Sequence, residues 1–197
     1  MVMIRQFDEE AVLDKVLGAF WTKGWQATSM ADLASTANVH RGSLYHAYGN
    51  KERLFLLAFD RYAARVIQES RMALQAPTAK TALQRFFDVT IKSMTADTPP
   101  RGCFTTKTAI ESELISANVR DRVRALLENL EGTVAEALLR DEIRNSLNIP
   151  PDKAAQIIIA FTRGLAVMEQ VYHDPTFLHG LSNNFIDLLI PQAAENE

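Results

Sequence analysis

Apolar residues recur along almost the whole chain at the spacing of one face of an α-helix, and alternation of apolar and polar residues is sustained nowhere. The first stripe runs from Leu13 to Trp21, between an acidic segment and Lys23-Gly24. These flanks are typical of a helix, because they suit the helix dipole and the C-terminal cap. The pattern predicts an all-α fold of about nine helices. After the first, the expected helices cover residues 30–36, 41–48, 51–75, 79 onward, 105–115, 119–144, 152–172 and 176–189.

Two of these helices are short and are joined by a three-residue turn, 37–39. Ser29 and Asp32 have the spacing of a capping box, in which each side chain binds the other residue's backbone N–H. Two short helices beneath a first helix have the organisation of a helix-turn-helix, whose second helix enters the DNA major groove. We therefore expect a DNA-binding domain over residues 1–50, joined by the long helix to a larger domain over residues 51–197. Ordinary surface helices have the same local pattern.

The outward side of the second short helix carries the groups expected to meet DNA. Leu44 and Tyr48 are spaced to face the core of the small domain, which leaves the other side outward: Arg41, Gly42, Ser43, Tyr45 and His46. An arginine fork suits guanine or phosphate, and a glycine allows close approach of the backbone. Hydroxyl groups are natural donors to phosphate.

The charge of the chain restricts any nucleic-acid surface to a small area. The 21 lysine and arginine residues against 24 aspartate and glutamate residues give a formal net charge of −3. Between residues 23 and 53 four basic residues face two acidic ones, but residues 1–50 hold four basic and five acidic residues. Binding must therefore depend on a few placed contacts and on helix N-termini aimed at phosphates.

Other features of the composition exclude several classes of protein. The 47% hydrophobic content is that of an ordinary globular chain, and no apolar run approaches the ~20 residues of a membrane span. A single cysteine excludes internal disulfides and a cysteine-based zinc site. The acidic N-terminal segment has no readable secretion signal. We expect a soluble, cytoplasmic protein with no metal or cofactor and no membrane contact.

Three segments near the N-terminus resemble a known family. They are residues 20–34 (FWTKGWQATSMADLA), 39–48 (VHRGSLYHAY) and 50–55 (NKERLF). Together they resemble the N-terminal domain of TetR-type transcriptional regulators, over about residues 8–60. The resemblance implies that Arg41 and Gly42 address bases. It also implies a set of phosphate contacts: Thr28, Ser43, Tyr45, His46 and Lys51.

Two positions depart from the family pattern. His40 stands where the family usually has a serine or threonine cap, and Ala47 stands where it often has histidine. His40 is therefore expected to cap the recognition helix weakly or to contact DNA itself, and the operator sequence is not transferable. Ser29 and His40, at the starts of the two short helices, complete the predicted DNA-binding set.

The last two predicted helices are apolar over most of their circumference. The first of them contains Ile157–Phe161 and Leu165–Met168, and the second, over residues 176–189, is similarly broad. Such helices must be covered on more than one side. We expect a homodimer in which they meet their copies as a four-helix bundle, as the resemblance also implies. Central helices of a monomer would have the same composition.

The middle helices are expected to enclose a small, largely apolar effector, because apolar cavities with a few polar groups are typical ligand sites. Glu111, if buried, would favour a cationic ligand. Ordinary core packing explains the same apolar residues. The predicted ligand-binding residues are Tyr62, Phe87, Ile91, Cys103, Phe104, Thr108, Glu111, Phe161, Leu165 and Met168.

Cys103 follows Arg101-Gly102 at the expected start of a helix, a position that favours a reactive thiol. The Gly-Cys-hydrophobic step is similar to that of a TetR branch, some of whose members sense electrophiles or oxidants. A lone cysteine is also a common small buried hydrophobe.

Together these features predict a DNA-binding regulator, most simply a repressor released from a palindromic operator when an effector tilts the helix that begins at residue 51. Oxidant or electrophile sensing through Cys103 is one alternative. A second is a small helical enzyme acting on an apolar substrate through Glu111, Cys103, His173 or His179, although no known catalytic motif is present. A third is a helical dimer that binds only protein partners.

Overall fold

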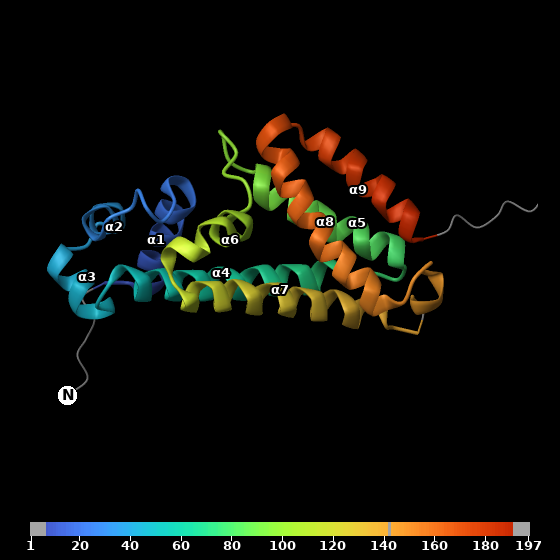
Figure 1. The fold of residues 1–197 in the computed structure, drawn as a ribbon, viewed down its shortest axis with the longest axis horizontal. Helices are drawn as coiled ribbons and strands as arrows, with labels where there is room; N and C mark the ends of the chain where they lie inside the picture. The colour runs from blue at the N-terminus through green and yellow to red at the C-terminus, as the bar shows by residue number, and fades with distance from the viewer. Residues whose placement is uncertain (1–6, 142, 191–197) are drawn as a thin grey trace, which may run out of the picture. The chain divides into compact units, whose positions relative to one another are not determined.

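A computed structural model describes residues 7–141 and 143–190. Over these residues it contains nine α-helices, one short 3-10 helix and no strand, which confirms the predicted all-α fold (Figure 1). None of the described helices is both long and apolar enough to cross a membrane. The elements are α1 (Glu9–Lys23), α2 (Met30–Ala37), α3 (Arg41–Tyr48), α4 (Lys51–Ala73), α5 (Ala79–Thr95), α6 (Phe104–Ile115), α7 (Ala117–Leu138), η1 (Arg144–Ser146), α8 (Pro151–Tyr172) and α9 (Pro175–Leu189).

The predicted helix over residues 119–144 is the one whose end was wrong. The structure ends α7 at Leu138, and a separate 3-10 turn follows at Arg144–Ser146. Arg140 contributes to the end of α7 at Leu138, because its guanidinium turns back and donates to the Ala137 carbonyl at 3.0 Å. Basic side chains that bind the last free carbonyls are a common way to finish a helix.

The chain forms two compact units. Among the described residues, the first consists of residues 7–65 together with Lys107–Arg124, and the second of Val66–Thr106 together with residues 125–141 and 143–190. Helices α4, α6 and α7 each contribute to both units. The predicted boundary between residues 50 and 51 concerns function, and it stays a prediction.

The core of the first unit includes a cluster of aromatic rings from α1, α4 and the loop after α1. The rings of Phe20 and Phe55 meet edge to face at 4.9 Å, and the Trp25 ring meets Phe55 at 5.5 Å. Leu44 and Tyr48 of α3 are fully buried, as their spacing predicts. Helix α1 packs on α2 and α2 on α3, so α3 is held by its apolar side (Figure 1).

The second unit is built around α5, α8 and α9, which pack against one another (Figure 1). Phe161 of α8 and Phe185 of α9 stack with ring centroids 4.1 Å apart, and the Phe87 ring of α5 meets both edge to face. These three rings fill the space between the three helices. Aromatic pairs of this kind add to the free energy gained by burying apolar surface.

Candidate nucleic-acid interface and ligand-binding region

The predicted capping box is present at the start of α2. The Ser29 hydroxyl accepts the Asp32 backbone N–H at 3.1 Å, and the Asp32 carboxylate accepts the Ser29 N–H at 2.9 Å. The Ser29 hydroxyl and backbone N–H hold the pKa of Asp32 below its usual value of 3.8, because both stabilise the charged carboxylate. At the other end of α2, Asn38 takes a left-handed conformation (φ 56°) that turns the chain into α3. The angle between α2 and α3 is therefore set locally.

Helix α3 presents polar groups on the side opposite its buried residues. Arg41, Gly42, Tyr45 and His46 are exposed and Ser43 is half-buried. The Arg41 guanidinium lies 5.5 Å from the centre of the Tyr45 ring, which orients the fork over the outer face of the helix. The predicted outward set is thus brought together on one face, although its contacts with DNA stay predictions.

His40 caps the N-terminus of α3, at the position where the family pattern usually has serine or threonine. Its Nδ1 accepts the Gly42 N–H at 3.2 Å. A Cβ on residue 42 would lie 3.3 Å from that Nδ1, so glycine leaves room for the imidazole to reach the backbone. The absence of a side chain at Gly42 thus serves the cap as well as the predicted approach of the backbone to DNA.

Two residues predicted to hold phosphates are engaged inside the first unit. Thr28 is buried, and its hydroxyl donates to the Gly24 carbonyl at 2.6 Å. The Lys51 Nζ donates to the carbonyls of Trp25 and Thr28, each at 2.9 Å, and lies 4.0 Å from the centre of the Trp25 ring. Burial lowers the pKa of Lys51, and the Glu111 charge opposes this shift. Both side chains hold the loop between α1 and α2, and their contacts with phosphate stay predictions.

The ten predicted ligand-binding residues are divided between the two units. Tyr62, Thr108 and Glu111 belong to the first unit and the other seven to the second. Phe87, Ile91, Cys103, Phe104 and Leu165 are buried and Phe161 is half-buried, whereas Met168 is 39% exposed. The Glu111 carboxylate accepts the Trp25 N–H at 3.0 Å, so it is occupied by the protein's own backbone. Contact of these residues with an effector stays a prediction.

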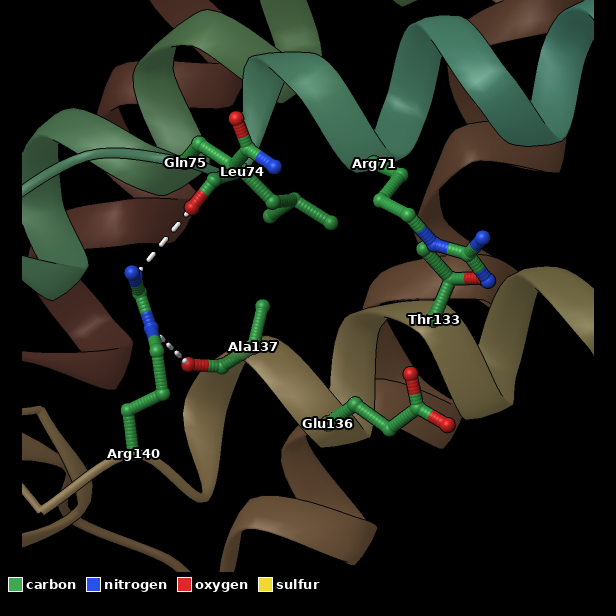
Figure 2. A pocket seen from close by; sticks show the side chains of 7 residues that line it. All are labelled: Arg71, Leu74, Gln75, Thr133, Glu136, Ala137 and Arg140. Atoms are coloured by element: carbon green, nitrogen blue, oxygen red, sulfur yellow. Dashed lines mark hydrogen bonds between the residues drawn. The ribbon is translucent and has the colours of Figure 1, made fainter.

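A pocket that the sequence did not predict lies in the second unit, where the end of α4 meets α7 (Figure 2). Its volume is about 190 Å³, below the roughly 300–1,000 Å³ usual for drug-sized ligands. Arg140 closes one end by donating to the Leu74 carbonyl at 3.1 Å. Figure 2 shows Arg71 and Glu136 on the opposite side. The lining residues are Arg71, Leu74, Gln75, Thr133, Glu136, Ala137 and Arg140.

The thiol of Cys103 is buried in the second unit and has a cationic neighbour. Arg163 of α8 donates through Nη1 to the Cys103 Sγ at 3.5 Å. Arg101, which stands two residues before Cys103 in the sequence, forms an ion pair with Asp97. Arg163 stands 60 residues from Cys103 along the chain, so no local pattern indicates the pair. Among the described residues, no cluster of three or more histidine, cysteine or acidic side chains could hold a metal ion.

The outer face of α8 is an apolar stripe. Ile157, Val167 and Val171 are exposed by 46%, 51% and 69%, and the small residues Ala160 and Gly164 are exposed between them. Large exposed apolar patches on a folded chain mark sites of association. The predicted breadth of the apolar surface on α8 is therefore present in the structure.

Comparison with known proteins shows family matches in the N-terminal and in the C-terminal part of the chain. Residues 12–58 match the family described as "Bacterial regulatory proteins, tetR family", and residues 79–185 match "Tetracyclin repressor-like, C-terminal domain". The transcriptional repressor ComR of Escherichia coli K12 is 29% identical over 147 residues, which are 74% of this chain and 69% of ComR.

Solved structures share the fold. Reduced NemR of E. coli superposes with a TM-score of 0.83 at 19% identity, covering 94% of this chain and 97% of NemR. A cysteine mutant of the TetR-family regulator CifR, bound to a 26-base-pair operator duplex, superposes with a TM-score of 0.81 at 24% identity, covering 95% and 99%.

Proposed function

Because the chain belongs to the TetR family of ligand-responsive, DNA-binding transcriptional regulators, we propose that α3 is its recognition helix and enters the major groove of an operator N-terminus first. Arg41 and Gly42 then meet base edges. The backbone phosphates are contacted by a surrounding set: Thr28, Ser29, His40, Ser43, Tyr45, His46 and Lys51.

The observation that carries this proposal is the division of α3 into two sides. Leu44 and Tyr48 are fully buried, whereas Arg41 and Tyr45 are exposed on the other side with the guanidinium held near the ring. A helix held by its apolar side offers its polar side rigidly, and rigid placement reduces the entropy lost on binding.

We further propose a homodimer formed through α8 and α9. The exposed stripe of Ile157, Val167 and Val171 supplies the apolar surface, and the small residues between them allow close approach of a second helix. Two-fold symmetry turns one recognition helix into a pair, which would read palindromic half-sites ~34–36 Å apart. We propose that the protein acts in the cytoplasm, as expected of a regulator that binds chromosomal DNA.

The effector that we propose is a small, largely apolar molecule bound among the ten residues named from the sequence. Its binding tilts α4 and changes the separation of the two recognition helices, so that both no longer fit the operator and the repressor is released. Linkage requires that operator and effector weaken each other's binding by the same factor.

Selection from random duplexes tests the proposal. The full-length protein should enrich a palindromic sequence, and Arg41→Ala should lose it while keeping its dimeric state. Failure of the wild-type chain to enrich any palindrome would contradict the proposal. A helical enzyme or a protein-binding dimer would be indifferent to Arg41→Ala.

A second candidate function is favoured by the contact between Arg163 and Cys103. The Cys103 thiol can add to an electrophilic carbon, in which case its S–H bond breaks as the S–C bond forms and the proton passes to the adduct. Treatment with a reactive aldehyde should then release the operator from the wild-type protein and not from Cys103→Ser. An unmodified thiol and unchanged DNA binding would eliminate this candidate.

A further inference from the structure

The loop between α1 and α2 is bound by charged side chains from two other helices. At Trp25, the backbone N–H donates to Glu111 Oε2 of α6 at 3.0 Å, and the carbonyl accepts from Lys51 Nζ of α4 at 2.9 Å. A second bond from Lys51 reaches the Thr28 carbonyl at 2.9 Å. The peptide groups on both sides of Trp25 are therefore held by ions of opposite sign.

The loop and the carboxylate are also matched in shape. Gly24 ends α1 with φ 77°, a conformation that side chains rarely adopt. A Cβ at this position would lie 2.7 Å from Glu111 Oε1, closer than real Cβ contacts come. Glycine thus provides both the backbone turn and the space that Glu111 occupies.

Further contacts join the same part of the chain to the start of α4. Glu52 accepts hydrogen bonds from the Ser116 hydroxyl at 2.8 Å and from the Asn118 amide at 3.1 Å. The part of α6 from Lys107 onward and the start of α7 share one compact unit with the helix-turn-helix.

We propose that Glu111 is a positioning residue for operator binding. Its carboxylate holds the α1–α2 loop, which ends at Ser29, the cap of α2, and so sets the orientation of α2 and α3. Without this hydrogen bond the loop loosens and the recognition helix loses its fixed placement. The inference rests on the proposed DNA-binding role of α3 and assigns to Glu111 a function in addition to its predicted ligand contact.

The test uses the full-length dimer without any effector. Three variants are compared with wild type: Glu111→Ala removes the acceptor, Glu111→Gln keeps an oxygen acceptor without the charge, and Glu128→Ala is a matched control at an exposed position of α7. Hydrogen exchange of the Trp25 amide, followed by NMR, reports the loop. Affinity for the selected operator and for a scrambled duplex of equal length reports DNA binding.

In Glu111→Ala, Trp25 exchange should be faster and operator affinity about tenfold weaker, the worth of one charge-assisted hydrogen bond. Affinity for the scrambled duplex should be unchanged. Glu111→Gln should restore most of both effects, and Glu128→Ala should behave as wild type. If Glu111→Ala does not fold, Trp25 protection in the wild type and the partial effect of Glu111→Gln carry the test.

Unchanged operator affinity or unchanged Trp25 exchange in a folded Glu111→Ala would overturn the inference. An equal loss for operator and scrambled duplex would overturn it too, because a positioning role acts on the specific complex. Failure of the wild-type protein to select an operator would instead contradict the proposed function, while Trp25 exchange would still report on the loop.

Discussion

The exposed faces of α3 and α8 are opposite in chemistry. Helix α3 exposes Arg41, Tyr45 and His46, whereas α8 exposes Ile157, Val167 and Val171. The groups on α3 are exposed to water, so the proposed contact with DNA would exchange water for phosphate and would be readily reversed. The apolar groups on α8 favour lasting burial, because exposing them again to water costs free energy. One face thus suits a partner that is released and the other a partner that is kept.

The largest expected effect comes from placing a charge on the apolar face. Val167→Glu puts two carboxylates near the two-fold axis of the proposed dimer, where neither has a partner. The dimer should weaken by at least about 100-fold, and operator binding should be lost with it because both half-sites must be engaged. Analytical ultracentrifugation at several concentrations measures this. A fully dimeric Val167→Glu at micromolar concentration would show that α8 is not the interface.

Arg41→Ala is expected to act on the other face alone. Loss of a bidentate base contact costs about 1–3 kcal/mol per half-site, so with two half-sites the operator affinity of the dimer should fall by at least about 30-fold. The dimer and its thermal stability should be unchanged because the side chain is exposed. Fluorescence anisotropy with operator and scrambled duplexes separates the loss of sequence-specific affinity from the loss of non-specific affinity. An equal loss for both duplexes would make Arg41 a phosphate contact.

Ser29→Ala is expected to destabilise α2, the helix that packs against α3. Removing the cap of α2 should lower the Tm by about 2–4 °C at pH 7. The Asp32 pKa is held below 3.8 only while the capping box is formed, so this stabilisation is present above that value and is lost as pH falls through the lowered pKa. The Tm difference between Ser29→Ala and wild type should therefore shrink in acid. A difference independent of pH would exclude this coupling.

Asp60→Asn should have the smallest effect, and it should raise the thermal stability where Ser29→Ala lowers it. Burial raises the pKa of Asp60 above 3.8, and Arg122, at 3.5 Å, opposes the shift only in part. Between 3.8 and the raised value the folded state binds more protons than the unfolded state, so stability falls as pH rises, and the cost remains at neutral pH. Because the side chain is 41% exposed, Asp60→Asn should raise the Tm by only about 1 °C at pH 7. The gain should vanish below pH 3.8.

Local pattern was sufficient to predict several features of the candidate site. Leu44 and Tyr48 repeat at helical spacing, and both are buried; Ser29 and Asp32 stand three residues apart, and both capping bonds form. In each case the two residues lie within one or two helical turns of each other, so helix geometry alone determines their relative positions.

Lys51 and Glu111 show where such reasoning ends. Lys51 stands at the start of a helix beside the DNA-binding domain, but its ammonium group turns to the Trp25 and Thr28 carbonyls, 26 and 23 residues away. Glu111 was assigned to a ligand, yet its hydrogen-bond partner is 86 residues earlier in the chain. The order of residues does not indicate which distant peptide groups will need a side-chain partner. Only the packing of the helices determines this.

The sequence by itself determined the helical fold, the caps of α1 and α2 and the two sides of α3, because these depend on residues within a few positions of one another. Only the tertiary structure decided that Glu111 and Lys51 hold the two peptide groups that flank Trp25, that Arg163 reaches Cys103, and that α4 and α7 enclose a pocket between Arg71 and Arg140. These arrangements join segments far apart in the chain. They arise because buried polar groups must find partners among the atoms that packing brings near.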